Sequence, residues 1–139
     1  MKFKPCSKMK SAVEQILSSL GLLDKFNSQK EFYVKICNDP FMPLTIERHS
    51  SQVTITHYFE QNGDLIPDPD VEFEIYEGRW LPIAIQHSTG HYVRTMSEGK
   101  GDNRIVFLDD YDDLLDFSAH WAKNLLDQGF AAGKVERVE

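Results

Sequence analysis

The stretch His57–Asp70, HYFEQNGDLIPDPD, carries the clearest fold signal in this sequence. Its Asn62-Gly63 pair tolerates the positive φ angles of a type I′ turn, so we expect the chain to reverse direction there. Before the turn, apolar and polar residues alternate through 52–60, which is typical of a strand with one buried face. After the turn, the two prolines of 67–70 lack ladder N–H donors and predict a rigid, extended lead into a further strand. The stretch therefore predicts an antiparallel hairpin.

The alternation continues on both sides of this hairpin. Period-two patterns predict strands at residues 31–37, 44–49, 52–60, 71–76, 80–87 and 92–96. Short, turn-like links join these strands, and sequential strands with such links form an antiparallel meander rather than parallel βαβ units. Residues 97–103, which include two glycines, are expected to form a flexible loop.

Two longer segments carry helical periodicity. Within residues 7–20 the apolar positions recur every three and four residues, and Gly21 supplies a stop. A second helix is expected from Asp109 or Asp110, as N-cap, to Gly129, as C′ residue. The fold class predicted is α+β: an antiparallel meander sheet of five or six strands with an N-terminal and a C-terminal helix packed on one face.

The chain is long and apolar enough to form one domain without disulfide or metal staples. It has 139 residues, of which 41% are hydrophobic and 12% aromatic. We expect a single domain over 1–139, with its core within about 8–130 and a polar tail at 131–139. Cys6 and Cys37 are widely separated and have no His neighbours, which predicts incidental thiols rather than a zinc or redox site. No cofactor is expected.

The charge balance bears on partners and location. A formal net charge of −7 disfavours direct binding to nucleic acid or to an anionic membrane. The basic cluster Lys2, Lys4, Lys8 and Lys10 precedes no signal-peptide core, and no apolar run reaches the length of a membrane span. The expected location is the cytoplasm.

Carboxylates after the turn form the first candidate site. On a regular strand Asp68, Asp70, Glu72 and Glu74 would share one face at about 7 Å spacing, which is too wide for one metal ion. Glu60 and Asp64 could complete the set across the turn. A magnesium or calcium site of Glu60, Asp64, Asp68 and Asp70 is therefore one alternative, and a solvated outer face is the other.

Three histidines, His57, His87 and His91, could together bind a metal ion. The competing interpretation is structural, because His87 and His91 flank the Ser88-Thr89-Gly90 turn. His57 alternates with residues of an apolar face, where a histidine is more often a hydrogen-bonded core residue.

Aromatic residues on the opposite strand face form a second candidate site. Alternation places Tyr58 and Tyr76 away from the helices, and it extends to Trp80 if the register holds. Aromatic anchors with a polar rim are typical of an interaction patch, although Tyr and Trp also simply favour strands. The predicted binding residues are Tyr58, Glu60, Glu72, Glu74, Tyr76 and Trp80.

Several of these motifs resemble a known family. They are the HYFEQNGDL run from His57, Asp68-Pro69-Asp70 with Phe73, Trp80-Leu81-Pro82, WAKNL from Trp121, and Gln128-Gly129-Phe130. Over roughly residues 10–131 the chain resembles a small family of domains of unknown function encoded on plasmids, integrative conjugative elements and phage-like elements, often near antirestriction and replication genes. The resemblance implies a genomic context, but it supplies no activity and no catalytic residues to carry over.

The leading functional hypothesis is a non-enzymatic accessory protein of a mobile genetic element. It would bind a protein or a small ligand through the open sheet face, and an anti-defence role is one form of this. The alternative is a divalent-metal-dependent enzyme that uses the Glu60/Asp64/Asp68/Asp70 carboxylates. The partner's identity and a homodimer are left open.

Overall fold

The computed structural model describes residues 3–99 and 101–139. Lys2 of the basic cluster and Lys100 of the predicted loop lie outside these ranges. The helices are α1 (Ser7–Ser19), α2 (Leu23–Ser28), α3 (Leu108–Asp127) and two 3-10 turns, η1 (Gly101–Asn103) and η2 (Phe130–Ala132). The strands are β1 (Glu31–Cys37), β2 (Leu44–His49), β3 (Gln52–Gln61), β4 (Asp64–Tyr76), β5 (Arg79–Gln86), β6 (Tyr92–Arg94) and β7 (Lys134–Val138).

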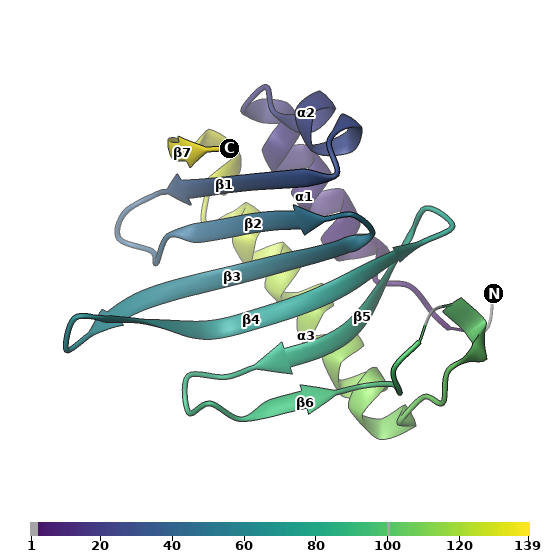
Figure 1. The fold of residues 1–139 in the computed structure, drawn as a ribbon. Coiled ribbons are helices and arrows are strands. Elements are labelled where there is room, and N and C mark those ends of the chain that lie inside the picture. The colour runs from purple at the N-terminus through teal and green to yellow at the C-terminus, as the bar shows by residue number, and fades with distance from the viewer. Residues whose placement is uncertain (1–2, 100) are drawn as a thin grey trace.

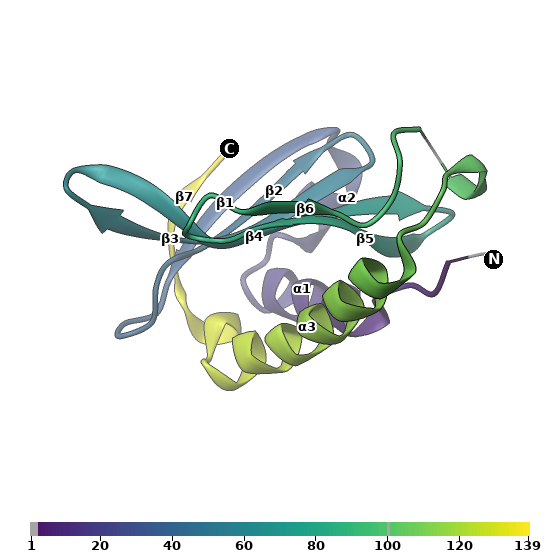
Figure 2. The same ribbon diagram turned by 90° about the horizontal axis from the view of Figure 1, so that it is seen from below.

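The strands form one antiparallel sheet in the order β6-β5-β4-β3-β2-β1-β7. Consecutive strands from β1 to β6 are neighbours, so the predicted meander is confirmed (Figure 1). Helices α1 and α3 lie together on one face of the sheet, as Figure 2 shows. The α+β class with both long helices on one face is therefore confirmed. We call the opposite face the outer face.

The sheet has a seventh strand where a polar tail was predicted. β7 pairs antiparallel with β1, with Val34 opposite Val138 and Cys37 opposite Lys134. The chain reaches this position because Gly129, at φ 79°, ends α3 and Phe130 is wholly buried. The tail prediction was wrong because Lys134–Val138 is short and mostly charged, so its alternation carries little signal.

The helices follow their predicted apolar stripes. α1 begins at Ser7 as expected, and the N–H of Gly21, at φ 74°, bonds to the Ser18 carbonyl at 3.1 Å. α3 begins at Leu108 with Phe107 as its N-cap, so the predicted aspartate cap is wrong. Asp109 and Asp110 lie instead in the first turn, where their negative charge interacts favourably with the helix dipole. No helix in residues 3–99 and 101–139 is long and apolar enough to cross a membrane.

The core lies between the sheet and the two long helices. Its fully buried members include Val13, Ile16 and Leu17 of α1, Leu125 of α3, and Val34, Ile46, Ile55, Val71 and Phe73 of the sheet. These are the apolar positions of the helical and period-two patterns. Burial of this continuous apolar layer is the main favourable term in folding.

The hairpin between β3 and β4 has the predicted turn. Asn62 and Gly63 both have positive φ, at 53° and 84°. β4 begins directly after the turn, so Pro67–Asp70 is part of the strand rather than a separate lead. The register shifts between Thr56 and Tyr58, which oppose Asp70 and Pro67. One extra β4 residue is accommodated there, as in a β-bulge.

Replacing Gly63 by valine is expected to destabilise the protein by about 1–3 kcal/mol. A β-branched side chain at φ 84° is strained, although a Cβ there would meet no atom within 4 Å. The expected loss is therefore backbone strain alone. Urea denaturation measures it, and an unchanged midpoint would contradict the assignment of this turn.

Candidate functional site

A bulge in β5 decides which aromatic residues reach the outer face. Along β4, Glu72 opposes Ala84 but Phe73 opposes Pro82, so Ile83 is an extra residue. The insertion exchanges the two faces of β5, and Trp80 therefore points toward the helices, opposite Ile75. Trp80 is 3% exposed and its ring centroid lies 5.7 Å from that of Phe73. The prediction that Trp80 belongs to the outer-face patch is wrong.

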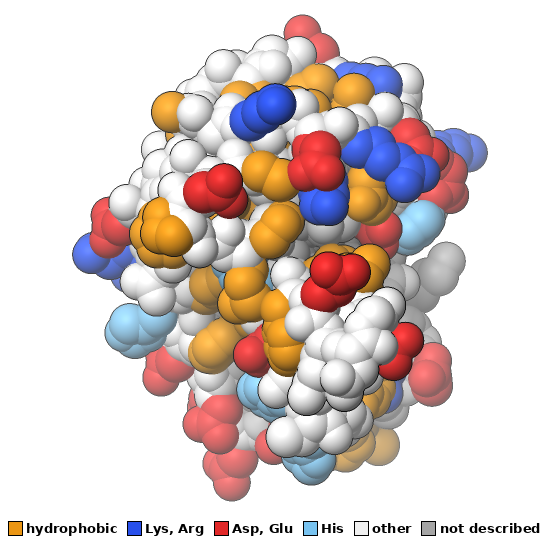
Figure 3. Space-filling view, turned by 90° about the vertical axis from the view of Figure 1, so that its left-hand side faces the viewer, with side chains coloured by type: hydrophobic (Ala, Val, Ile, Leu, Met, Phe, Trp, Pro, Cys, Tyr) orange, Lys and Arg blue, Asp and Glu red, His pale blue; other side chains and the backbone are white. Residues whose placement is uncertain are grey.

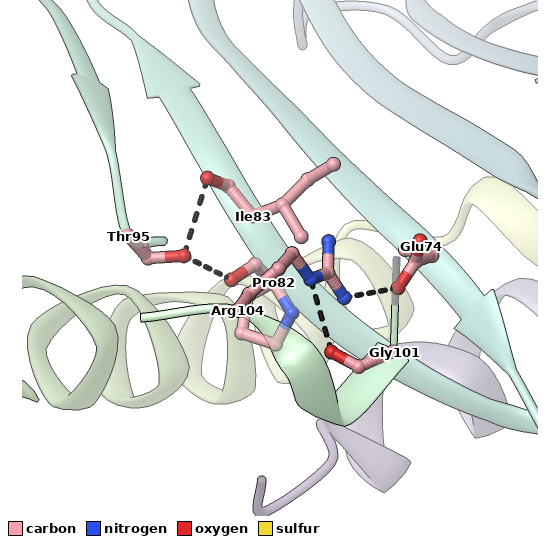
Figure 4. Close-up of polar contacts among 6 residues, drawn as sticks. All are labelled: Glu74, Pro82, Ile83, Thr95, Gly101 and Arg104. Atoms are coloured by element: carbon pink, nitrogen blue, oxygen red, sulfur yellow. Dashed lines mark hydrogen bonds and ion pairs between the residues drawn. The ribbon is translucent and has the colours of Figure 1, made fainter. Parts of the chain in front are cut away.

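The end of the outer face near the β4–β5 turn is covered by the protein's own chain. In Figure 2 the segment between β6 and α3 rises above the face opposite the helices. Figure 4 shows Arg104 from this segment ion-paired with Glu74. The Arg104 Nε also donates to the Gly101 carbonyl at 3.1 Å, and the Thr95 hydroxyl donates to the Pro82 carbonyl at 2.8 Å.

The covering segment removes two further residues from the predicted binding patch. Glu74 is a buried ion-pair partner rather than an exposed rim residue. A Cβ built on Gly101 would lie 2.7 Å from the Tyr76 ring, so this segment packs closely against Tyr76. The prediction that the outer face is open is therefore wrong at the end near the β4–β5 turn. Within the loop predicted at 97–103, Gly101 is buried and begins the 3-10 turn η1.

The open part of the outer face holds a pocket beside Tyr58. We define the Tyr58 pocket as a concave site of about 300 Å³ lined by Tyr33, Lys35, Pro43, Thr45, Glu47, Tyr58 and Leu65. Cross-strand pairing aligns Lys35, Thr45, Thr56 and Asp70 in one row across β1–β4. Thr45 and Thr56 are buried in this row, at 2% and 1% exposed.

Asp70 carries the strongest electrostatic perturbation beside this pocket. Burial, followed by the charges of Glu72 and Glu47, raises its pKa from 3.8 to about 6, against a hydrogen bond from Thr56. Its Oδ1 atom is buried and has no hydrogen-bond partner among the described residues. Burial and the charges of Asp70 and Glu47 also raise the pKa of the Tyr58 hydroxyl. The negative charges of Glu47, Asp70 and Glu72 therefore act together in this part of the outer face.

Replacing Asp70 by asparagine is expected to stabilise the protein above about pH 6. The folded-state pKa is raised, so the charged form costs stability as pH rises from about 4 to about 6, and the full cost remains above that range. We expect a gain of about 1 kcal/mol near pH 8, after allowance for solvent screening, and almost none near pH 4.

Urea denaturation of both proteins at the two pH values measures the gain. Besides burial, the groups that set it are Glu72 on β4, Glu47 on β2 and Thr56 on β3. Tyr58 on β3 and Gln86, opposite on β5, also neighbour Asp70. Asp64→Asn, at the exposed hairpin end, is the matched control and should leave the free energy of unfolding unchanged at both pH values. An equal gain near pH 4 would contradict the electrostatic cause.

The four carboxylates of the proposed metal site are not brought together. Glu60 opposes Leu65 and Asp64 opposes Gln61 at the hairpin end, whereas Asp70 opposes Thr56, four residues before Glu60 on β3. The charge of Asp68 acts on the ring of His57. Across 3–99 and 101–139, no group of three or more His, Cys, Asp or Glu side chains could hold a metal ion.

The histidines of the alternative trio have structural surroundings. His57 is 5% exposed, lies 5.4 Å from the Trp121 ring centroid, and hydrogen-bonds through Nδ1 to the Pro43 carbonyl at 3.1 Å. Burial lowers its pKa. His87 and His91 close the β5–β6 turn through a backbone hydrogen bond of 3.0 Å. The structural interpretation of His57 as a hydrogen-bonded core residue is confirmed.

Two other surface features are candidates. Figure 3 shows hydrophobic side chains gathered on the end of the molecule where the β1–β2 loop and the β3–β4 hairpin project. Phe41, Met42 and Leu65 are 40%, 37% and 67% exposed there. On the helix side, a groove of about 590 Å³ is lined by Ser7, Lys8, Ser11, Ala119, His120, Ala122, Lys123 and Leu126.

Sequence reasoning identified Tyr58 and Glu72 on the outer face but missed the pocket residues of the first two strands. Tyr33 and Lys35 alternate with the buried residues of β1, and Thr45 and Glu47 follow on β2. The signal was present, because residues opposite the apolar positions of an alternating strand share the outer face. The strand register that aligns these residues across β1–β4 cannot be read from the alternation.

Comparison with known proteins gives one finding. No curated protein and no solved structure matches the chain. The sequence model of a domain of unknown function, DUF6908, matches residues 11–131, which include most of α1, all of α3 and the six strands of the meander. The chain belongs to the DUF6908 family.

Proposed function

We propose that this protein is a binding module that takes a ligand or a partner protein in the Tyr58 pocket. The observation that carries the proposal is a pocket with tyrosines 33 and 58 in its lining beside a carboxylate, Asp70, whose buried Oδ1 has no partner in the described residues. Sites for ligands are concave, with a few polar groups that fix orientation. An unpaired buried acceptor costs stability, which a bound donor would recover.

The surroundings of the pocket support a binding role. Leu65 lies on its lining and is 67% exposed, and Pro43 connects it to the exposed Phe41 and Met42 of the β1–β2 loop. Contiguous exposed apolar side chains with a polar rim are typical of interaction sites. Tyr58 is also a residue type that is enriched among binding hot spots.

The biological setting that we propose is an accessory role in a mobile genetic element. Its support is the resemblance of the HYFEQNGDL motif and the flanking motifs to domains encoded on such elements. An anti-defence role would be one form of this. The net charge of −7 favours a protein or small ligand over nucleic acid as the direct partner.

A fragment screen followed by NMR tests the site. The full chain, labelled with ¹⁵N, is titrated with a library of small polar and aromatic fragments. We expect the binding fragments to shift the amides of Lys35, Thr45 and Tyr58. Fragments that shift only the amides of the helix groove, at Ser11 and Ala122, would contradict the proposal, as would a library without any binder.

A further inference from the structure

We propose that the Tyr58 pocket accepts a basic side chain, an arginine or a lysine, presented by a partner protein. This inference rests on the binding role proposed above and specifies the chemistry of the partner. Three features carry it: the unpaired acids Glu47, on the pocket lining, and Asp70 and Glu72, on the nearby strand β4; the aromatic lining; and the apolar residues of the lining.

The acids beside the pocket are not neutralised by the protein itself. Glu47, Asp70 and Glu72 form no ion pair in residues 3–99 and 101–139. The nearest hydrogen bond to Glu72 comes from the Tyr92 hydroxyl, at 3.4 Å. Carboxylates bind cations, and a guanidinium can donate two hydrogen bonds to one carboxylate.

The protein's own cations near the pocket are already held by other acids. Lys35 Nζ lies 3.5 Å from Glu136 Oε1 on β7, and Arg137 is ion-paired with Glu139. These pairs turn the nearby positive charges toward the β7 edge. Glu47 on the pocket lining, and Asp70 and Glu72 on the nearby strand β4, are therefore left without a cationic partner from the protein's described residues.

The tyrosines supply a surface on which a cation can stack. The Arg137 guanidinium already lies over the ring of Tyr33, at 5.3 Å from the ring centroid. Tyr58, which lines the same pocket, offers a second ring beside Asp70 and Glu47. Cation–π contacts of this geometry favour planar guanidinium groups in particular.

The size and the apolar lining of the pocket favour a side chain of a protein over a free small cation. A volume of about 300 Å³ is at the lower end for small-molecule sites and suits one long side chain. Leu65 and Pro43 give the lining an apolar part, and the exposed Phe41 and Met42 directly precede Pro43 in the chain. A free polyamine would leave these apolar residues uncovered.

The test is an NMR titration of the full chain with two matched probes. N-acetyl-arginine amide is expected to shift the amides of Thr45, Tyr58 and Asp70 with a Kd on the order of 1–10 mM, whereas N-acetyl-citrulline amide, its neutral isostere, should bind about tenfold more weakly. Asp70→Asn and Glu47→Gln should each weaken arginine binding about tenfold, and Asp64→Asn, which lies outside the pocket, should leave it unchanged.

A peptide arm distinguishes the source of the cation. A short peptide with one arginine next to leucine should bind more tightly than N-acetyl-arginine amide, and spermidine should bind no better than the amide. Equal affinities for arginine and citrulline would overturn the inference, and so would a preference for spermidine. If fragments occupy the pocket but arginine does not, the inference fails while the proposed binding role stands.

Discussion

Replacing Trp80 by alanine is expected to lower the free energy of unfolding by about 3–5 kcal/mol. Trp80 is 3% exposed and packs in the core with its ring centroid 6.3 Å from Phe26 and 5.7 Å from Phe73. Removal of the indole leaves a large cavity between the sheet and α2, which the rigid strands β4 and β5 cannot fill. Chemical denaturation followed by circular dichroism measures the loss.

Tyr92→Ala provides the matched control for this substitution. Tyr92 is an aromatic residue of the neighbouring strand β6 and is 46% exposed, so its loss should change the free energy of unfolding by less than about 1 kcal/mol. Equal effects of the two substitutions would place Trp80 at the surface. That result would contradict the β5 bulge and the face assignment that follows from it.

Replacing Arg104 by alanine is expected to cost about 3–5 kcal/mol, because it leaves the Glu74 carboxylate buried without its partner. The side chains of Arg104 and Glu74 are only 3% and 11% exposed. The double variant Glu74→Gln/Arg104→Met removes both charges and should recover most of the loss. Thermal and chemical denaturation of the wild type, Arg104→Ala and the double variant measures the loss of stability and its recovery.

An exposed ion pair of the same residue types gives the control. Arg94 lies 3.9 Å from Glu98, whose side chain is 92% exposed, so Arg94→Ala should cost less than about 1 kcal/mol. A loss for Arg104→Ala as small as that for Arg94→Ala would mean that the covering segment does not pack on the outer face. The whole face would then be open, as the sequence predicts.

Much of the fold could be predicted because it depends on local periodicity. The strands at 31–37 and 44–49 have the predicted bounds, and α1 begins at the predicted residue. Alternation and helical repeats arise from which side of an element is buried, so each is visible in a short window of sequence. The Asn62-Gly63 turn is likewise a local property, since it depends on positive φ.

The parts that could not be predicted depend on distant contacts. One extra residue at Ile83 reverses the faces of β5, and nothing in the alternation of 80–87 marks it. Arg104 covers Glu74 from 30 residues away in the chain, and β7 joins the sheet beside a strand that begins about a hundred residues earlier. Such contacts are set by tertiary packing, which overrides local propensity.

The candidate site could be predicted only where it depends on the alternation within one strand. Tyr58 and the acids of β4 were identified by their alternation, whereas Thr45 and Glu47 enter the site through the register of β2 with β3. Glu74, Tyr76 and Trp80 were removed from the site by the covering segment and by the bulge. Of the predicted patch, Tyr58 and Glu72 remain on the open part of the outer face, and Asp70, which was predicted only as a metal ligand, lies between them along β4.

Tyr58→Ala separates a binding role of Tyr58 from a role in folding. The melting temperature of Tyr58→Ala and its NMR response to the fragments that bind the wild-type protein are measured on the same sample. We expect melting within a few degrees of the wild type, since the side chain is only half-buried, together with loss of the fragment-induced shifts at Lys35 and Thr45. If Tyr58→Ala melts as low as Phe73→Ala, or if it keeps wild-type fragment binding, Tyr58 is a structural residue and the account is wrong.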